Sequence, residues 1–166
     1  RARRTRHLMA RTVEVATELE CTPDAAWHWL QRPALLDHVA EPMMRFEYEG
    51  TLDRNAPWPE GEHAAQLVAF GRIPFGRQVI GIEYVESDGD TRIMRDNGRS
   101  ALIRKWDHWA TIAPAAGGAK AHYIDRVHID AGALTAAIAA YAKAYYTHRQ
   151  RRWRALAKQD FAALRA

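Results

Sequence analysis

Residues 131–165, AGALTAAIAAYAKAYYTHRQRRWRALAKQDFAALR, are the stretch that decides the fold of this chain. Neither proline nor glycine occurs between positions 133 and 164, and alanine, the residue with the highest helix propensity, fills much of the stretch. Its larger apolar side chains recur mostly in steps of three or four, at Leu134, Ile138, Tyr141, Tyr145, Trp153 and Leu156. The spacing predicts one long helix of about 50 Å. Its apolar stripe needs a long apolar surface to lie against.

Short strand-like segments before the helix supply that surface. Residues 11–20 alternate, with Val13, Val15 and Leu19 on one side and Glu14 and Glu18 on the other, which predicts a half-buried strand. Further strands are predicted at 43–49, 63–72, 78–86, 91–96, 101–112 and 120–130.

Turn residues separate these strands closely. The turns are predicted at Pro74 with Gly76, at 87–90, at Asn97-Gly98, and at Pro114 with 117–118. Such short connections favour an antiparallel meander, because parallel pairing needs long crossovers.

Two short helices are predicted directly after the first strand. Thr22-Pro23-Asp24 combines a capping hydroxyl, a proline at the first helical position and an early acid. Pro33 ends this helix, and a second short helix follows over residues 33–39. The predicted order is therefore strand, two short helices, about six antiparallel strands and one long helix.

Length and composition indicate one globular domain. The 166 residues are 48% hydrophobic and 27% charged, which lies within the globular range. We expect a basic N-terminal arm at 1–10 and a single domain at 11–166. No run approaches the ~18 apolar residues of a membrane span. The single cysteine, Cys21, excludes an internal disulfide framework and fits a reducing compartment, so we expect a cytoplasmic protein.

Several motifs, in this order, resemble the SRPBCC superfamily, which includes START lipid-transfer domains, the major birch-pollen allergen and polyketide cyclases. The similar segments are Thr22-Pro23-Asp24 with Trp27, Gly71-Arg72-Ile73-Pro74-Phe75-Gly76, Trp106-Asp107-His108, Tyr123-Ile124-Asp125-Arg126-Val127, and Ala131-Gly132-Ala133-Leu134-Thr135 with Tyr146, His148-Arg149-Gln150 and Trp153. They cover roughly residues 11–157 and are most similar to an uncharacterised bacterial branch.

The resemblance implies an α+β helix-grip fold, in which a curved antiparallel sheet of about six to seven strands wraps around the C-terminal helix. It also implies an apolar cavity between sheet and helix. It implies no single activity, because members range from carriers to cyclases.

The last two strands supply candidate cavity residues. Centring their hairpin near Ala116-Gly117 places His108 opposite Asp125 on one largely apolar face. The pair would be a carboxylate orienting an imidazole for acid–base work or ligand contact, or a satisfied polar pair joining two strands. The residues predicted to contact a ligand are Trp106, His108, Ala110, Ile112, Tyr123, Asp125, Val127, Ile138, Tyr141 and Tyr145.

The sequence gives no pattern typical of a metal site, a calcium loop or a reactive cysteine. The histidines show no set of three with metal-ligand spacing, so we expect no metal and no cofactor. The acidic segment 88–91 lacks the pattern of a calcium loop and is predicted to be a hairpin turn. Cys21 precedes a helix, where its pKa could be lowered, but we interpret it as a buried small residue.

Arginines crowd both ends of the chain. Arg1, Arg3, Arg4 and Arg6 open it, and the helix end carries Arg149, Arg151, Arg152, Arg154 and Lys158. One interpretation is a solvated helix end whose cations complement the helix dipole. The other is a site for anionic partners, such as an anionic membrane surface. Nucleic acid is disfavoured as a partner, because the arginines spread around the helix and Trp153 is the one aromatic residue among them.

The sequence favours binding or transport of a small hydrophobic or amphipathic ligand in the cavity. One alternative is a cyclase- or lyase-type enzyme, similar to polyketide cyclases and dehydratases, with His108 and Asp125 as the acid–base pair. A third hypothesis is an interaction module that binds anionic partners through the basic helix end.

Overall fold

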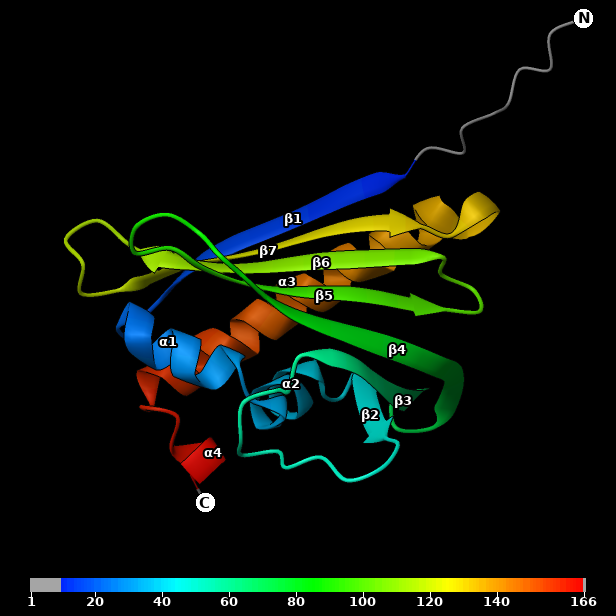
Figure 1. Cartoon of the computed structure of the whole chain (residues 1–166), viewed down its shortest axis with the longest axis horizontal. Coiled ribbons are helices and arrows are strands. Elements are labelled where there is room, and N and C mark those ends of the chain that lie inside the picture. The colour runs from blue at the N-terminus through cyan, green and yellow to red at the C-terminus, as the bar shows by residue number, and fades with distance from the viewer. Residues whose placement is uncertain (1–9, 166) are drawn as a thin grey trace, which may run out of the picture.

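The structure is a computed structural model that describes residues 10–165 (Figure 1). Seven strands form one sheet: β1 (Arg11–Leu19), β2 (Met44–Tyr48), β3 (Gly61–Ala69), β4 (Ile73–Val85), β5 (Arg92–Ser100), β6 (Lys105–Pro114) and β7 (Ala121–Asp130). The helices are α1 (Pro23–Leu30), α2 (Pro33–Ala40), the short 3-10 turn η1 (Gly132–Leu134), α3 (Thr135–Lys158) and α4 (Ala162–Arg165). This element order confirms the predicted one.

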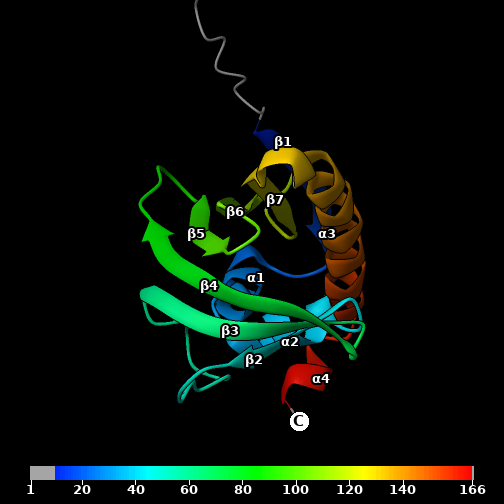
Figure 2. The ribbon, with the colours of Figure 1, turned by 90° about the vertical axis from the view of Figure 1, so that its right-hand side faces the viewer.

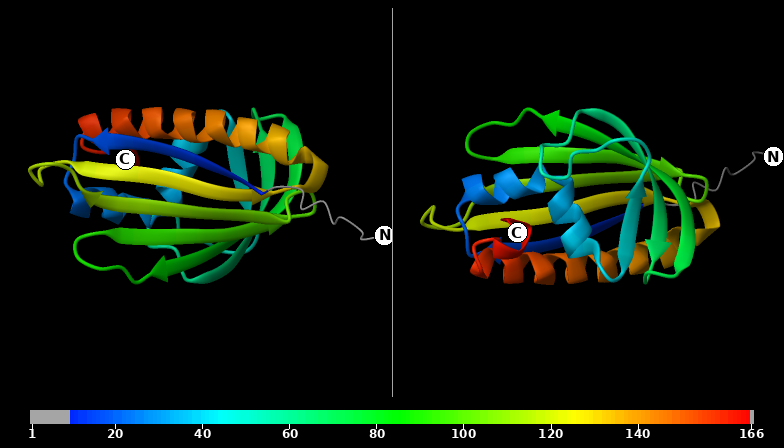
Figure 3. Two further views of the ribbon diagram at one scale, coloured as in Figure 1. Left: turned by 90° about the horizontal axis from the view of Figure 1, so that it is seen from above. Right: turned by 90° about the horizontal axis from the view of Figure 1, so that it is seen from below.

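All strand pairs are antiparallel, in the order β1-β7-β6-β5-β4-β3-β2. Viewed along its length, the sheet bends so that β2, β3 and β4 lie below β5, β6 and β7, and α3 closes the open side (Figure 2). The views from above and below show α3 running alongside β1, with α1 and α2 on the inner side of the sheet (Figure 3). The sheet therefore grips α3, as the helix-grip prediction required.

The start of α1 forms as its sequence predicts. The Thr22 hydroxyl accepts a hydrogen bond from the backbone N–H of Ala25 at 3.2 Å, and Pro23 occupies the first helical turn. Trp29 is buried and stacks on Phe161, with ring centroids 5.5 Å apart. Trp27 is half-buried and meets Tyr84 edge to face.

Two predicted turns lie inside strands instead. Residues 97 and 98 belong to β5, where a Cβ on Gly98 would stand 2.9 Å from the carbonyl oxygen of Val79. Glycine there permits close approach of β4 and does not form a turn; the chain reverses at 101–104. Pro74 likewise lies within β4, and the reversal before it uses Phe70 and Gly71, both with positive φ.

The C-terminal helix is shorter than predicted. α3 has 24 residues, about 36 Å, and ends at Lys158. Asp160 and Phe161 then adopt positive φ, and Phe161 is fully buried, which turns the chain back to the domain before α4. Burial of one large aromatic side chain thus outweighs the helix propensity of the alanine-rich tail.

The predicted apolar stripe is only partly the buried face of α3. Leu134 precedes α3 and is 48% exposed, so its predicted burial is wrong. Ile138 and Tyr141 are half-buried. The helix instead buries a face that includes polar side chains: Thr135, Ala139, Ala142, Tyr145, Tyr146, Arg149, Gln150, Trp153, Leu156 and Ala157.

No helix between residues 10 and 165 is long and apolar enough to cross a membrane.

Candidate ligand cavity and its buried polar cluster

A cavity of about 80 Å³ lies between the inner face of the sheet, α2 and α3. Most of its lining is apolar, with side chains such as Leu36, Leu67, Ile80, Ile82 and Met94. A cavity needs only ~10–15 Å³ on this scale to hold one water molecule. The space therefore holds several waters or a small ligand group, and a larger ligand must displace lining side chains.

The structure separates the ten predicted ligand residues into two groups of five. Trp106, His108, Ile138, Tyr141 and Tyr145 line the cavity. Ala110, Ile112, Tyr123, Asp125 and Val127 are buried on the same face of β6 and β7 but do not line it. The direct contact predicted for the second group has no support in this structure, and contact by the first group stays a prediction.

Helix packing explains the division. Tyr123 lies edge-on to the ring of Trp153 on α3, with centroids 4.1 Å apart, and Ala110 and Ile112 pack in the same hydrophobic cluster. The period of two along each strand predicts which face is inward. It cannot show how much of that face a helix covers.

The predicted register of β6 and β7 is wrong by two residues. His108 pairs with Val127 and Asp125 pairs with Ala110, because the connection spans 115–120 instead of a tight turn near Ala116. An even shift keeps each side chain on its predicted face. His108 and Asp125 therefore become diagonal neighbours, and His108 Nε2 lies 2.7 Å from Asp125 Oδ1.

Three side chains donate hydrogen bonds to the Asp125 carboxylate. Tyr123 and His108 contact Oδ1, and Gln150 Nε2 donates to Oδ2 at 2.9 Å and also to the carbonyl oxygen of Val15 at 2.7 Å. Burial raises the pKa of Asp125, but Arg149 and the His108 hydrogen bond outweigh it and leave that pKa below its usual range. Asp125 is therefore a carboxylate anchored by the protein.

His108 is neutral in this setting. Burial lowers the pKa of its imidazole, and Asp125 only partly opposes that effect. Because the Asp125 carboxylate only accepts, Nε2 of His108 carries the proton and Nδ1 is the unprotonated nitrogen. Nδ1 has no hydrogen-bond partner among residues 10–165. The side chain lines the cavity, so a basic nitrogen is available to a cavity ligand.

Arg149 is the main correction to the predicted basic helix end. It is 6% exposed and lines the cavity, where it lies over the ring of Tyr146 at 5.8 Å from the centroid. Its Nη2 donates to the Tyr123 hydroxyl at 3.2 Å. Burial works against the cation, but Tyr123 and Asp125 outweigh this and raise the pKa of Arg149. It is a buried charge and not part of a solvated helix end.

The rest of the basic cluster lies at the surface. Arg151, Arg154 and Lys158 are exposed, and Arg154 donates to the Thr17 hydroxyl at 2.9 Å. Arg152 is half-buried and donates to the carbonyl oxygen of His38. The predicted N-terminal arm lies outside the described residues, apart from Ala10.

Asp96 is a cavity residue that the sequence did not reveal. It lines the cavity from β5, directly opposite His108 on β6. Its Oδ1 accepts a hydrogen bond from the backbone N–H of Gly81 at 2.8 Å. Burial raises the pKa of Asp96 to about 7, although the Gly81 hydrogen bond and Arg149 lower it. This carboxyl group therefore titrates near neutral pH.

The missed residues left some signals in the sequence. Arg149 stands four residues after Tyr145 and eight after Tyr141, so helical spacing puts it on their side of α3. Asp96 was missed because the predicted turn at 97–98 ended its strand too early. With the reversal at 101–104, the alternation in β5 places Met94 and Asp96 on the inner face.

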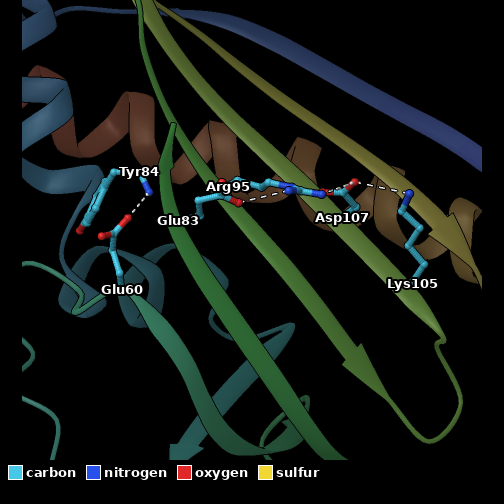
Figure 4. Close-up of polar contacts among 6 residues, drawn as sticks. All are labelled: Glu60, Glu83, Tyr84, Arg95, Lys105 and Asp107. Carbon is cyan, nitrogen blue, oxygen red and sulfur yellow. Dashed lines mark hydrogen bonds and ion pairs between the residues drawn. The ribbon is translucent and has the colours of Figure 1, made fainter. Parts of the chain in front are cut away.

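The outer face of the same strands carries charged pairs. Next to His108, Asp107 points outward and receives two hydrogen bonds from Arg95, at 2.7 and 3.2 Å, with Lys105 3.5 Å away (Figure 4). Arg95 also contacts Glu83 at 3.1 Å. Burial raises the pKa of Asp107, but Arg95 outweighs this and lowers it. These contacts join β4, β5 and β6 outside the cavity.

Neither Cys21 nor a metal cluster adds a second site. Cys21 is half-buried, and burial with nearby carboxylates raises its thiol pKa to about 11, so the alternative of a lowered pKa is wrong. Within residues 10–165, no group of three histidine, cysteine, aspartate or glutamate side chains is arranged to hold a metal ion.

Comparison with known proteins gives a family and a fold. The model of a family described as "Domain of unknown function (DUF8410)" matches residues 17–157. A search of curated protein sequences found no match.

Solved structures of three proteins share the overall fold of the chain and have low sequence identity to it. A START superfamily protein from Mycobacterium smegmatis is 10% identical, with a TM-score of 0.60 over 89% of this chain and 97% of that one. Norcoclaurine synthase from Thalictrum flavum, solved with dopamine and hydroxybenzaldehyde, is 9% identical, with a TM-score of 0.62 over 91% and 88%. The Zhui aromatase/cyclase from Streptomyces sp. R1128 is 11% identical, with a TM-score of 0.59 over 91% and 95%. These likenesses confirm the predicted helix-grip fold.

Proposed function

We propose that this chain, which belongs to the DUF8410 family of domains of unknown function, binds a small hydrophobic or amphipathic molecule between its sheet and α3. The observation that carries the proposal is the cavity, which is lined mainly by apolar side chains and by a few polar groups that converge on one side. Ligand sites commonly combine apolar walls with a few placed polar groups. The norcoclaurine synthase with the same fold was solved with two small aromatic molecules.

The apolar walls supply affinity, and the polar groups supply orientation. Removing apolar ligand surface from water is worth roughly 25 cal/mol per Å². When a ligand displaces water from the cavity, the remaining donors and acceptors of Arg149, His108 and Asp96 stay satisfied only if the ligand offers them hydrogen-bond partners. An amphipathic molecule meets both requirements. Carriage of such a molecule needs no further chemistry from the protein.

Native mass spectrometry and probe binding test this proposal. N-phenyl-1-naphthylamine, a neutral fluorescent probe, should bind the purified protein one-to-one. Met94→Trp fills the cavity and should weaken that binding about tenfold or more, whereas Leu102→Trp, at an exposed position, should not change it. Failure of the wild-type protein to bind the probe or to retain any small molecule would contradict the proposal.

Catalysis is the second candidate, and the geometry of His108 favours it. Asp125 fixes Nε2 of the imidazole and leaves Nδ1 unprotonated, which is the state of a general base. Asp125 does not line the cavity, so within this candidate it positions His108 and does not touch the substrate. For any compound that co-purifies, His108→Gln should slow conversion about a hundredfold or more while the compound still binds. Equal turnover by His108→Gln would remove this candidate.

Binding to an anionic membrane through the helix end stays a prediction, which rests on the exposed Arg151, Arg154 and Lys158 because Arg149 is buried. A cytoplasmic location also stays a prediction.

A further inference from the structure

Arg149 has unused hydrogen-bonding capacity inside the cavity. A guanidinium group carries five N–H donors and no acceptor. Here Nη2 donates to the Tyr123 hydroxyl, and Nε is buried without an acceptor among residues 10–165. In that described part of the chain, no carboxylate lies within salt-bridge distance of the Arg149 nitrogens.

The nearest acidic partner is already occupied. Asp125 is linked to Arg149 only through the Tyr123 hydroxyl, and its two oxygens accept from Tyr123, His108 and Gln150. Asp125 thus balances the charge of Arg149 without accepting a hydrogen bond from it directly. A buried donor with no acceptor is costly, and native structures rarely leave one without a purpose.

Resting on the proposed function, we infer that Arg149 binds the anionic head of the cavity ligand, a carboxylate on an apolar body. The planar guanidinium fork matches a carboxylate, and a buried charge-assisted hydrogen bond is stronger than a neutral one. The apolar body then lies against the side chains of Leu67, Ile80 and Met94.

The surrounding charges favour a monoanion. Arg149 and Asp125 balance each other, so a carboxylate adds one uncompensated negative charge, and a phosphate monoester adds up to two. Asp96 lines the same cavity and feels the charge of Arg149, so further negative charge there is repelled unless Asp96 is protonated. A carboxylate should therefore bind better than a phosphate on the same chain.

A competition experiment with matched ligands tests the inference. N-phenyl-1-naphthylamine occupies the cavity of the full chain, and octanoate, octyl phosphate or octanol displaces it. These three share one alkyl chain and differ in the head group. In the wild-type protein, octanoate should displace the probe at about tenfold lower concentration than octanol, and octyl phosphate should lie between them.

Arg149→Met should reduce the advantage of octanoate over octanol, measured as the ratio of their displacing concentrations with the same variant, to about twofold or less. Arg154→Met, an exposed arginine on the same helix, should keep the full advantage. If Arg149→Met does not fold, Arg149→Met with Asp125→Asn removes both charges together and serves the same comparison.

The outcomes separate the two proposals. If the probe does not bind the wild-type protein, the proposed function itself fails. If the probe binds but octanol displaces it as well as octanoate does, only the anion site is overturned. The anion site is also overturned if Arg149→Met keeps the octanoate advantage. If octyl phosphate displaces best, the ligand class is a phosphate and the carboxylate assignment is wrong.

Discussion

His108 and Asp125 touch although neither is the other's direct partner across the strands. His108 on β6 lies opposite Val127, and Asp125 on β7 lies opposite Ala110, yet Nε2 and Oδ1 are 2.7 Å apart. Diagonal neighbours on one face of an antiparallel pair are within reach of long side chains. The contact thus links His108, which lines the cavity, to the buried polar side chains of Tyr123, Arg149 and Gln150.

Asp125→Asn should lower the free energy of unfolding by about 2–3 kcal/mol and leave a folded protein, because it weakens three buried hydrogen bonds and leaves Arg149 unbalanced. Denaturant unfolding at pH 7 measures the change. Probe binding should persist, since Asp125 does not line the cavity. Loss of less than about 0.5 kcal/mol would show that the hydrogen bonds are not formed in solution.

The same pair predicts acid sensitivity. The pKa of His108 lies below its ordinary 6.5 and that of Asp125 below 3.8, so in acid the unfolded chain binds protons before the folded chain does. His108 should therefore contribute a loss of stability as pH drops below about 6.5, and Asp125 a further loss near its ordinary pKa, while Asp96 acts in the opposite direction over part of the same range. Unfolding measured from pH 7.5 to 4 checks this. The first loss should be absent in His108→Gln.

Asp96 should affect the pH dependence of stability in the direction opposite to His108, and Asp96→Asn should remove that effect. The pKa of Asp96 is raised from 3.8 to about 7, so the wild-type protein loses stability as pH rises through that range. Gly81 N–H, Arg149, His108 and Asp107 are the groups that face or influence it. The asparagine variant lacks this loss and should gain on the order of 2 kcal/mol over wild type between pH 5 and pH 8. A pH-independent difference would contradict the raised pKa.

Leu156→Ala should cost about 2–5 kcal/mol, because Leu156 is buried in the main hydrophobic cluster. Ile138→Ala should cost less, about 1–2 kcal/mol, because Ile138 is half-buried at the cavity. The apolar stripe in the sequence contains both residues and, taken alone, predicts similar losses. Chemical denaturation of both variants compares the two ends of α3, and a greater loss for Ile138→Ala would mean that Ile138 is packed more tightly than the structure shows.

Asp107→Asn should cost about 1–2 kcal/mol and leave ligand uptake unchanged. Its carboxylate receives two hydrogen bonds from Arg95 on the outer face of the sheet, away from the cavity (Figure 4). Thermal unfolding and probe titration on the same sample give both values. This variant is a control for Asp125→Asn, and altered probe binding would show that the outer face communicates with the cavity.

Local sequence determined most of the fold. The Thr22-Pro23 helix start, the alternation in β1 and the alanine-rich C-terminal stretch each specify an element through interactions within a few residues. The inward face of β6 and β7 was also predictable, because a period of two fixes it for any register shift by an even number of residues. These features rest on backbone geometry and propensity, which the sequence carries directly.

Only the tertiary structure decided the site. The register of β6 with β7 depends on a six-residue connection, and the end of α3 depends on where Phe161 is buried. Arg149 is charged and lies in an arginine-rich segment, so by composition it belongs at the surface. It is buried because α3 sets it above Tyr123, whose hydroxyl links it to Asp125, a carboxylate 24 positions earlier in the chain. Buried charges depend on partners distant in sequence, and packing is what brings those partners together.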